Sequence, residues 1–376
     1  MNFIDSVDIT NKKVILRCDL NVPIKDGKVL DDTKIKKSIK TISYLLNNNC
    51  SVIILSHLGR IKTSVDKLEN SLKPCKKILE DNLNQEVIFL DNPVGMNVIT
   101  TCKNLKCKQV VLLENTRFCD FPEKLESRND LGLAKYWSVL ADVFVIDAFA
   151  SLHRLHASVA GIANYLPTYF GFLVKNEIEG LNPVIKDIKR PFTVFMGGAK
   201  VDDKLEYIKG LLTKCDYLLV GGGIANSFLY ACGFDVIDSL CTSDEITISE
   251  IKALMKEYKD KIVLPIDFVI DEDKILDLNT KSINKYCSYL EKSKTIFING
   301  TVGAFENKKY AIGTYKLFDY LKNVDAIKIA GGGDTVNAIN LFKLKHNFTF
   351  LSSGGGASLE YISSNHLRAI DYITKL

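Results

Sequence analysis

Four polar motifs in the first half of the chain each follow an apolar run and have the composition of an anion-binding site. They read Asp-Leu-Asn, His-Leu-Gly-Arg, Glu-Asn-Thr-Arg and His-Arg-Leu-His and span 19–21, 57–60, 114–117 and 153–156. Because the carboxyl ends of parallel strands meet at one edge of a sheet, we expect these motifs to converge. Their cationic and imidazole side chains suit a small ligand with carboxylate and phosphate groups; they are His57, Arg60, Arg117, His153 and Arg154.

Other residues in these motifs either support the predicted anion-binding site or allow an alternative to it. Asp19 and Asn21 add acceptors for a substrate hydroxyl. Only seven of the 49 basic residues are arginine, and four of the seven stand in or beside these motifs, where a planar fork of donors would matter. His153 and His156 could instead be metal ligands or core histidines, because their three-residue spacing supports either and no carboxylate triad accompanies them.

Glycine-rich segments in the second half also follow apolar runs, and they suggest phosphate binding by backbone N–H groups. They are Gly-Gly-Ala-Lys at 197–200 and glycine triplets at 221–223, 331–333 and 354–356. Glycine lets the backbone approach an anion closely, and a helix N-terminus favours negative charge. We expect a helix to open at the first segment, with Lys200 and Lys204 on one face beside the anion. The alternative is a tight turn with two surface lysines.

Residues around the last two triplets add metal-binding and phosphate-binding groups. Asp334 is placed to hold Mg²⁺, which prefers carboxylate and phosphate oxygens, and Thr335 could donate to a phosphate. The triplet Gly354, Gly355 and Gly356 predicts a further anion-binding turn between a strand and a helix. The chain has no GxxxxGK(S/T) P-loop and no GxGxxG dinucleotide motif, so the usual NTPase and dehydrogenase interpretations lose their main support.

Short apolar runs alternate with helix-patterned segments along the whole chain. The predicted strands are 13–18, 51–56, 109–113, 143–146, 192–195, 217–220, 262–264, 295–298, 326–330 and 348–351. The predicted helices include 34–46, 200–212, 249–258 and 314–321. Nearly continuous apolar strands are typical of parallel sheets covered on both faces, so we predict an α/β fold with two doubly wound parallel-sheet domains. The segment 174–190 is predicted to be one helix that joins them.

The composition is that of a soluble two-domain protein. At 376 residues, with 47% hydrophobic and 25% charged residues, the chain can bury two cores. A net charge of +4 gives no support to a nucleic-acid partner. Ten cysteines without a CxxC pair indicate a reducing compartment, and neither a signal peptide nor a membrane-spanning run is visible. We therefore expect a cytoplasmic protein with no membrane partner.

Taken together, the motifs resemble those of phosphoglycerate kinases. The first-half blocks are RCDLNVP at 17–23, SHLGR at 56–60, LENTRF at 113–118 and DAFASLHRLHAS at 147–158. The second-half blocks are GGAKVDDK at 197–204, NG at 299–300, GGGDT at 331–335 and SSGGGASLE at 352–360. The resemblance implies a phosphoglycerate-binding domain at 1–172, an interdomain helix or hinge at 173–190 and a nucleotide-binding domain at 191–363. It also implies that residues 364–376 pack back on the first domain.

The resemblance further implies an activity and a set of contacts. The enzyme would transfer a phosphoryl group between 1,3-bisphosphoglycerate and ADP, giving 3-phosphoglycerate and ATP, as a monomer that closes at a hinge and uses Mg²⁺. The implied phosphoglycerate contacts are Asp19, Asn21, Lys34, His57, Arg60, Arg117 and Arg154. The implied nucleotide contacts are Gly198, Ala199, Lys204, Gly223, Asn299, Glu306 (ribose), Gly332, Gly333, Asp334 (metal) and Thr335. Lys200, with Lys34 and Arg154, would act on the transferred group.

This chain also departs from the pattern it resembles. Lys34 stands where the family has arginine, so a bidentate fork of donors is lost. The block 298–301 and the stretch 268–279, which would shape the wall around the adenine, differ too. These departures leave two alternatives. One is a catalytically impaired kinase-fold protein retained for ligand or protein binding, and the other is a kinase for a different small molecule.

Overall fold

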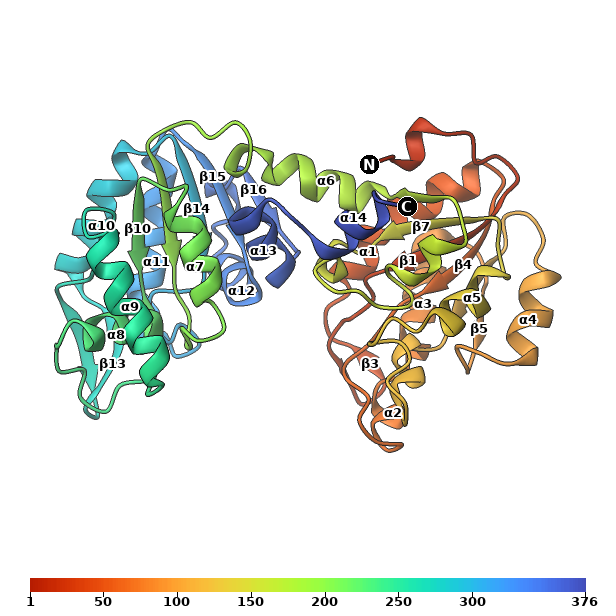
Figure 1. Ribbon diagram of the computed structural model, residues 1–376, viewed down its shortest axis with the longest axis horizontal. Helices are drawn as coiled ribbons and strands as arrows, with labels where there is room; N and C mark the ends of the chain where they lie inside the picture. The colour runs from red at the N-terminus through yellow and green to blue at the C-terminus, as the bar shows by residue number, and fades with distance from the viewer. The chain divides into compact units, whose positions relative to one another are not determined.

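A computed structural model describes all 376 residues, and the chain divides into two compact units that are described separately below. Unit 1 comprises Met1–Ile178 and His366–Leu376, and unit 2 comprises Glu179–Asn365. The chain passes from one unit to the other within helix α6 (Phe172–Leu181) (Figure 1). The predicted division at 1–172, 173–190 and 191–363 has slightly different bounds, and the roles assigned to its parts stay predictions.

The prediction of a single helix over 174–190 was wrong. Helix α6 ends at Leu181, and a short 3-10 turn, Asn182–Val184, follows it. Pro183 lies in this turn and has no backbone N–H to continue the helical hydrogen-bond ladder. None of the helices in the chain combines the length and apolar character needed to cross a bilayer.

Unit 1 is built on a six-stranded parallel sheet in the order β5-β6-β4-β1-β7-β8. Its strands are β1 (Lys13–Cys18), β4 (Ser51–Leu55), β5 (Val87–Leu90), β6 (Val110–Leu113), β7 (Val143–Asp147) and β8 (Thr168–Phe170). A small hairpin, β2 (Ile24–Lys25) with β3 (Lys28–Val29), lies outside the sheet. The sequence predicted β1, β4, β6 and β7 but missed β5 and β8, which are short and partly exposed.

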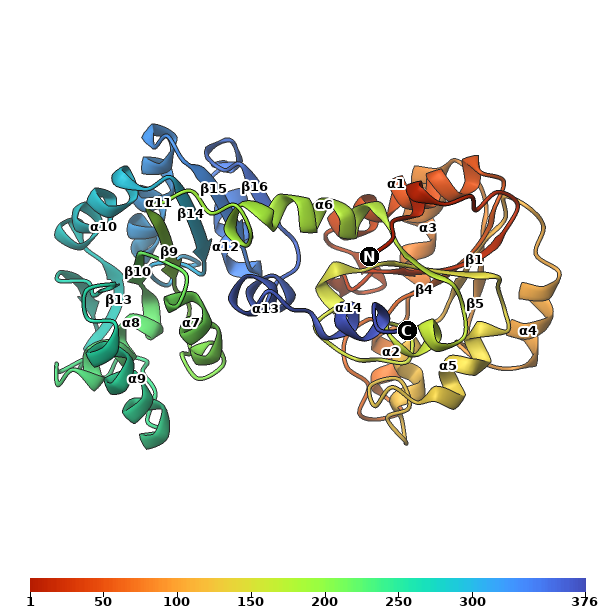
Figure 2. The same cartoon turned by 45° about the horizontal axis from the view of Figure 1, so that its top comes forward.

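Helices cover both faces of this sheet (Figure 2). They are α1 (Thr33–Asn47), α2 (Asp66–Glu69), α3 (Lys73–Leu83), α4 (Met96–Lys103), α5 (Leu131–Ser138) and the C-terminal α14 (Arg368–Ile373). Along β1, Val14 and Leu16 pack into the core under α1 and α3, and Ile15 between them is buried on the opposite face. Burial of successive residues explains why the strands read as continuous apolar runs rather than as alternating ones.

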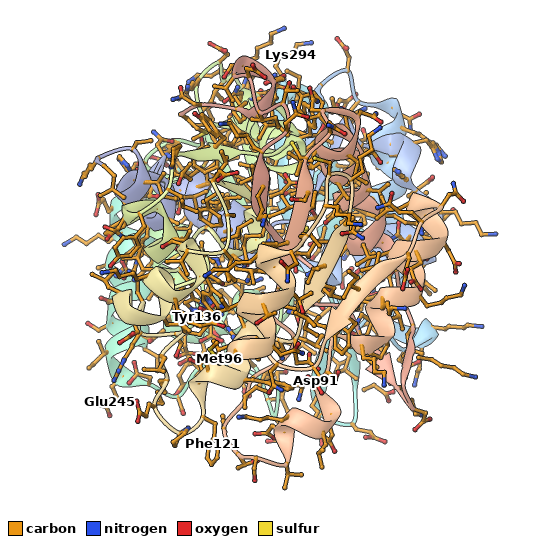
Figure 3. The ribbon with its side chains drawn as sticks, turned by 90° about the vertical axis from the view of Figure 1, so that its right-hand side faces the viewer. Asp91, Met96, Phe121, Tyr136, Glu245 and Lys294 are labelled. Carbon is orange, nitrogen blue, oxygen red and sulfur yellow. The ribbon has the colours of Figure 1, made fainter.

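Helix α5 carries the only tryptophan of the chain and is tied to the loop before α4. The indole N–H of Trp137 donates to the carbonyl of Pro93 at 2.8 Å, and the hydroxyl of Tyr136 bonds to Gly95 at 2.8 Å. Figure 3 shows Tyr136 beside Met96, the first residue of α4. Trp137 is fully buried, so its fluorescence reports on the folding of unit 1.

Unit 2 repeats the architecture with a parallel sheet in the order β11-β10-β9-β14-β15-β16. Its strands are β9 (Phe192–Met196), β10 (Tyr217–Val220), β11 (Ile262–Val263), β14 (Thr295–Asn299), β15 (Ile327–Gly331) and β16 (Phe350–Ser352). An antiparallel hairpin, β12 (Phe268–Asp271) with β13 (Lys274–Leu278), was not predicted. The helices are α7 (Leu205–Leu212), α8 (Gly222–Ala231), α9 (Glu245–Glu257), α10 (Thr280–Lys292), α11 (Ile312–Tyr320), α12 (Gly333–Leu341) and α13 (Gly356–Ser364).

The order of strands places a natural ligand site in each sheet. In both, the chain first builds one side of the first strand and then crosses to its other side, which reverses the order between β1 and β7 and between β9 and β14. In unit 1 the chain reaches the edge strand β5 before it returns to form β6 between β5 and β4. Doubly wound sheets bind ligands beyond the carboxyl ends of their strands at such reversals. The motifs 19–21 and 153–156 follow β1 and β7, and the segments 197–204 and 299–300 follow β9 and β14.

Asp147, at the end of β7, caps the first turn of α6. Its Oδ1 accepts the backbone N–H groups of Leu173 at 2.8 Å and Val174 at 3.3 Å. The side chain is fully buried, and this burial raises its pKa to about 6. Because the folded protein binds this proton more tightly than the unfolded chain does, the resulting stability is complete below about pH 4 and is lost as the pH rises through about 6.

Substitution Asp147→Asn should therefore flatten the pH dependence of unit 1 stability. Asparagine keeps an acceptor for α6 without the charge, so a loss of up to about 3 kcal/mol between about pH 4 and pH 7 should disappear. Urea unfolding followed by Trp137 fluorescence at several pH values measures this. Asp277→Asn is the matched control, because burial also raises the pKa of Asp277 to about 6, but in unit 2. Equal pH slopes for Asp147→Asn and the wild type would contradict the prediction.

Ile237, in the loop between α8 and α9, is strained. Its φ is +54°, and it is the only β-branched residue among the non-glycine positions with positive φ. Left-handed backbone is about 1–2 kcal/mol unfavourable for a residue with a Cβ, and 43% of the Ile237 side chain is exposed, so burial offsets little of this.

Substitution Ile237→Gly should raise the free energy of unfolding of unit 2 by about 1 kcal/mol, because glycine adopts this φ without strain. Calorimetry measures the effect as a shift of the unfolding transition of unit 2. Trp137 fluorescence identifies the other transition, because Trp137 lies in unit 1. Asn365→Gly, at φ +65° in the same unit, should not raise the stability, since asparagine tolerates this region and its Oδ1 accepts a hydrogen bond from Lys214 at 2.8 Å that glycine would remove. A lower stability for Ile237→Gly would show that the contacts of the side chain outweigh its strain.

Candidate functional site

A polar cavity of about 120 Å³ lies at the carboxyl ends of the unit 1 strands. Loops that follow β1, β4, β6 and β7 line it together with α1, and the lining residues are Asp19, Asn21, Lys34, His57, Arg117, Ala150, Ser151, His153, Arg154 and His156. The structure thus brings together all the predicted phosphoglycerate contacts except Arg60, which is exposed and outside this lining. Ser151 also lines the cavity and was missed, because a lone serine carries no pattern.

Asn115 joins two of the motif loops and thereby places Arg117. Its Oδ1 accepts the backbone N–H groups of Arg117 at 3.0 Å and Leu58 at 3.1 Å. The guanidinium of Arg117 also donates to the carbonyl of Gly59. Nε of Arg117 and the hydroxyl of Ser151 are buried without a protein partner. Buried polar atoms without partners are unfavourable, so these two are available to a polar ligand.

Asp19, Asn21 and Lys34 are also engaged with the protein. Nζ of Lys34 lies 3.0 Å from Oδ2 of Asp19, and the lysine side chain is 34% exposed. Oδ1 of Asp19 accepts the N–H of Asn21 at 3.1 Å, and the side-chain oxygen of Asn21 accepts the N–H of Gly59 at 3.1 Å. These contacts fix the loops after β1 and β4 against each other, and they leave Lys34 at the rim of the cavity.

The cavity is cationic although its histidines are neutral. Burial lowers the pKa of His57 well below its ordinary value, and it lowers the pKa of His153 to about 4 and of His156 to about 3, with nearby arginines acting in the same direction. The permanent charges in the lining are those of Lys34, Arg117 and Arg154 against that of Asp19. This balance suits an anion with more than one negative charge.

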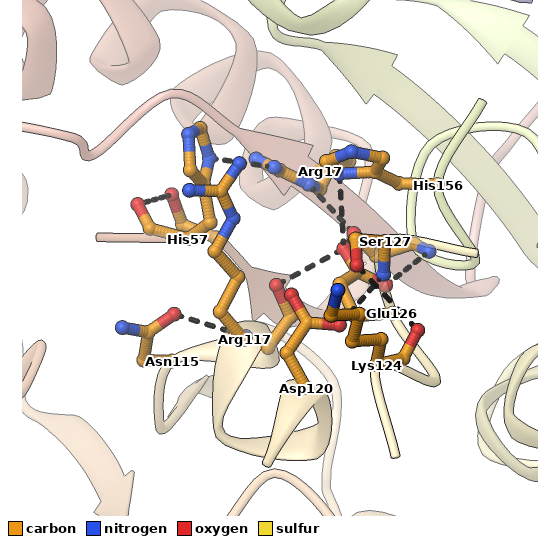
Figure 4. A network of polar contacts seen from close by, with 12 residues as sticks. Arg17, His57, Asn115, Arg117, Asp120, Lys124, Glu126, Ser127 and His156 are labelled. Carbon is orange, nitrogen blue, oxygen red and sulfur yellow. Dashed lines mark hydrogen bonds and ion pairs between the residues drawn. The ribbon is translucent and has the colours of Figure 1, made fainter. Parts of the chain in front are cut away.

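His153 and His156 both line this cavity, which is the setting that the sequence predicted for His153. No group of three or more His, Cys, Asp or Glu side chains in the chain is arranged to bind a metal ion. Behind the cavity, Arg17 and Glu126 form a buried polar network (Figure 4). Sequence reasoning passed over both, although Arg17 is one of the seven arginines and opens a motif block.

A second cavity, of about 220 Å³, lies at the carboxyl ends of the unit 2 strands, where the strand order reverses. Loops after β9, β10, β14 and β15 line it, and its residues are Gly198, Ala199, Gly222, Gly223, Asn226, Leu240, Ile275, Leu276, Thr301, Gly303, Ala304, Glu306 and Asp334. Of the predicted nucleotide contacts, Gly198, Ala199, Gly223, Glu306 and Asp334 face this cavity.

The glycines around this cavity fall into two classes. A Cβ on Gly223 would lie 2.0 Å from the carbonyl oxygen of Ala199, and one on Gly197 would lie 2.1 Å from that of Thr301. These glycines let neighbouring loops pack backbone against backbone. A Cβ on Gly333, Gly355 or Gly356 would meet nothing within 4 Å, so the backbone is open to a ligand at those positions. Only the second class fits the predicted role of glycine as an approach path for phosphate.

The prediction that Lys200 and Lys204 share a helix face was wrong. Helix α7 begins only at Leu205, and turns occupy the residues between the two lysines. Nζ of Lys204 donates to the carbonyl of Gly197 at 2.8 Å and to Oδ1 of Asn299 at 2.9 Å. Burial lowers the pKa of Lys204, and nearby carboxylates oppose this. Lys204 therefore braces the loops, whereas Lys200 is exposed and has no ion pair.

Asn299 and Thr335 connect the loops after β14 and β15. The amide of Asn299 donates to the carbonyl of Gly331 at 2.8 Å. The hydroxyl of Thr335 donates to the same carbonyl at 2.9 Å and accepts the N–H of Gly300 at 2.7 Å. Its hydrogen is therefore not free for a phosphate in this structure. Both side chains are buried and shape the cavity from behind.

The apolar wall of the cavity comes from a loop and from the β12–β13 hairpin. Leu240 lies in the loop before α9, and Ile275 and Leu276 lie on the β12–β13 hairpin. The amide of Asn226 donates to the carbonyl of Leu240 at 3.1 Å and holds that loop. Strands of four and five residues with mixed burial give no clear periodicity, so the hairpin was not predicted, although the resemblance assigned its stretch, 268–279, to the wall around the adenine.

Comparisons with known proteins agree with this geometry. A family model described as phosphoglycerate kinase matches residues 4–365. The chain is 40% identical to the phosphoglycerate kinase of Mycoplasmoides gallisepticum, covering 98% of this chain and 97% of that protein. It is also 40% identical to that of Enterococcus faecalis, covering 97% and 96%.

Solved structures give the same result. The chain superposes on phosphoglycerate kinase from Coxiella burnetii with a TM-score of 0.86 at 33% identity, covering 99% of this chain and 98% of that one. It superposes on the enzyme from Pyrococcus horikoshii with a TM-score of 0.87 at 29% identity, covering 100% and 98%. The predicted fold class is thereby confirmed. The chain belongs to the phosphoglycerate kinase family.

Proposed function

We propose that this chain transfers a phosphoryl group between 1,3-bisphosphoglycerate and ADP, giving 3-phosphoglycerate and ATP. The observation that carries the proposal is the presence, in a member of this family, of a cationic cavity in unit 1 and a glycine-lined cavity in unit 2. Phosphoryl transfer passes through a loose transition state, so the protein contributes mainly positioning and charge stabilisation. The two cavities offer the groups that such a reaction needs.

In unit 1, the proposed ligand is phosphoglycerate. Arg117 and Arg154 offer forked donors to its carboxylate and phosphate, and Lys34 at the rim adds a point charge toward the transferred group. Asp19 and Asn21 are the proposed partners of its hydroxyl. The contact between Arg60 and phosphoglycerate that the resemblance implies stays a prediction, because Arg60 lies outside the cavity lining.

In unit 2, the proposed ligand is the nucleotide. Glu306 is the proposed partner of the ribose. The open backbone at Gly333, Gly355 and Gly356 is the proposed partner of phosphate oxygens, and the contact of Gly332 with the nucleotide stays a prediction. Asp334 lies on the cavity at the start of α12 without an ion-pair partner, which fits a carboxylate that shares Mg²⁺ with the nucleotide phosphates. Bound Mg²⁺ would neutralise and orient those phosphates. Lys200 is the proposed stabiliser of the transferred group.

The remaining features of the proposal rest on family membership. We propose a cytoplasmic monomer whose substrates are small molecules, with no nucleic-acid or membrane partner. Hinge closure between the two units stays a prediction. The comparisons give no support to the alternative of a kinase fold retained only for binding.

Purified protein should form ATP from 1,3-bisphosphoglycerate and MgADP, and Lys200→Met should reduce kcat by about 10²–10³ because a charge at the transferred group is lost. A coupled assay of ATP formation measures both. Lys256→Met, another exposed lysine of unit 2, is the matched control and should keep full turnover. Absence of turnover in the wild-type protein would contradict the proposed activity. Full turnover in Lys200→Met would show that Lys200 does not stabilise the transferred group.

Lys34 tests the departure from the family pattern. Lys34→Met should lower kcat/KM by about 10²–10³, because both the charge and the pair with Asp19 are lost. Lys34→Arg should keep or raise kcat, since a guanidinium restores the fork at this position. Steady-state kinetics with 3-phosphoglycerate and MgATP distinguish the two. A Lys34→Met variant with wild-type kinetics would show that residue 34 does not contact the transferred group.

A further inference from the structure

The imidazole of His57 lines the anion cavity, and its Nδ1 faces a buried guanidinium. Nη2 of Arg17 lies 2.8 Å from Nδ1 of His57. An arginine side chain stays protonated in proteins and only donates hydrogen bonds. Nδ1 must therefore accept this bond, and the single proton of the neutral ring lies on Nε2.

Arg17 is fixed in this orientation by the rest of its guanidinium. The side chain is fully buried. Its Nε donates to the hydroxyl of Ser158 at 3.0 Å, and Nη1 donates to the carbonyl of Cys18. All its nitrogens are thereby engaged, so the group cannot turn away from His57 without leaving a buried donor unpaired.

Glu126 completes the network on the other side of Arg17 (Figure 4). Its carboxylate is fully buried and accepts the backbone N–H of Ser158 at 2.9 Å and the hydroxyl of Thr116 at 3.2 Å. The Ser158 hydroxyl accepts from Arg17 and so directs its own hydrogen to Glu126. The carboxylate thus acts only as an acceptor, and its charge compensates that of Arg17.

We infer that Arg17, directly, and Glu126, through Ser158 and Arg17, are positioning residues that hold His57 as the neutral tautomer with its proton on Nε2. His57 then offers the bound anion a hydrogen bond from Nε2 while carrying no charge. The identity of that anion rests on the proposed function. The tautomer itself belongs to the free protein and does not depend on that function.

The surroundings of His57 also oppose a positively charged ring. The charged and titratable groups around the ring are Arg17, Lys34, Arg117 and His156, and those that share its cavity are Asp19, His153 and Arg154. Burial and then Arg17 lower the pKa of His57. A proton on Nδ1 would set two donors against each other. The contribution of His57 to anion affinity should therefore stay constant from about pH 8 to about pH 6.

Nitrogen NMR of the histidine rings in the full-length, ¹⁵N-labelled protein measures the tautomer directly. The chain has only five histidines, and the His57 signals are assigned from their absence in His57→Gln. We expect a pyridine-like Nδ1 and a pyrrole-like Nε2 that do not change between about pH 6 and pH 8. A pyrrole-like Nδ1 or an imidazolium in this range would overturn the inference, whether or not the protein has kinase activity.

Variants test the positioning role. The double variant Arg17→Met with Glu126→Gln removes both charges, so neither is left buried and unpaired. We expect its His57 to titrate near the ordinary pKa of about 6.5, with exchange between tautomers. KM for 3-phosphoglycerate should become dependent on pH, with a smaller change in kcat. Ser158→Ala should shift both readouts less, in the same direction.

Arg128→Met is the control, because that arginine is exposed and pairs only with Asp130. It should leave the His57 signals and the pH profile of KM unchanged. A folded double variant that keeps the fixed Nε2–H tautomer and a flat pH profile of KM would overturn the positioning role. If the double variant does not fold, the wild-type nitrogen spectrum still decides the tautomer.

Discussion

Consecutive parallel strands in one sheet need a crossover that returns the chain to its starting edge, so the loops that leave the carboxyl ends collect together. Unit 1 brings its motif loops to one cavity in this way, and unit 2 does the same with its glycine-rich loops. Loops packed so closely bury polar groups, and each of these groups then needs a partner. Asn115 in unit 1 and Asn299 in unit 2 supply this by joining two loops with one side chain.

The same constraint decides what could be predicted from the sequence. Strands buried on both faces, such as β1 and β10, read as continuous apolar runs and were placed at their observed bounds. Residues that line the cavities from strand ends, such as Arg117 and Asp334, were found because the motif follows the strand directly. The loop-bracing role of other residues could not be predicted, since the sequence does not show which loop lies opposite. Lys204, Thr335 and Gly223 were predicted only as nucleotide contacts, and in the structure each also joins neighbouring loops.

The anion sites proposed for the two units use different physical means, and this shapes what surrounds each site. Backbone N–H groups need open glycines but no counter-charge, so the turn at 354–356 is formed without a buried ion. Side-chain recognition in unit 1 gathers several cations, and the one at Arg17 is fully buried. A buried cation is tolerated only with a carboxylate and complete hydrogen bonding, which Glu126 and Ser158 provide. The network behind the cavity is therefore a requirement of the chemistry in front of it.

The different response of lysine and arginine to burial accounts for the places where this lysine-rich chain has arginine. Burial lowers the pKa of a lysine such as Lys204, whereas a buried arginine keeps its charge because its intrinsic pKa is so high. Arg17 and Arg117 are buried and must stay charged while donating in several directions. Position 34 is different, because its side chain is one-third exposed and already paired with Asp19. A lysine there keeps a cationic group beside Asp19 but lacks the planar fork of donors that arginine has. The departure at 34 thus changes the geometry of the donors at the rim of the cavity more than it changes the sign of the charge there.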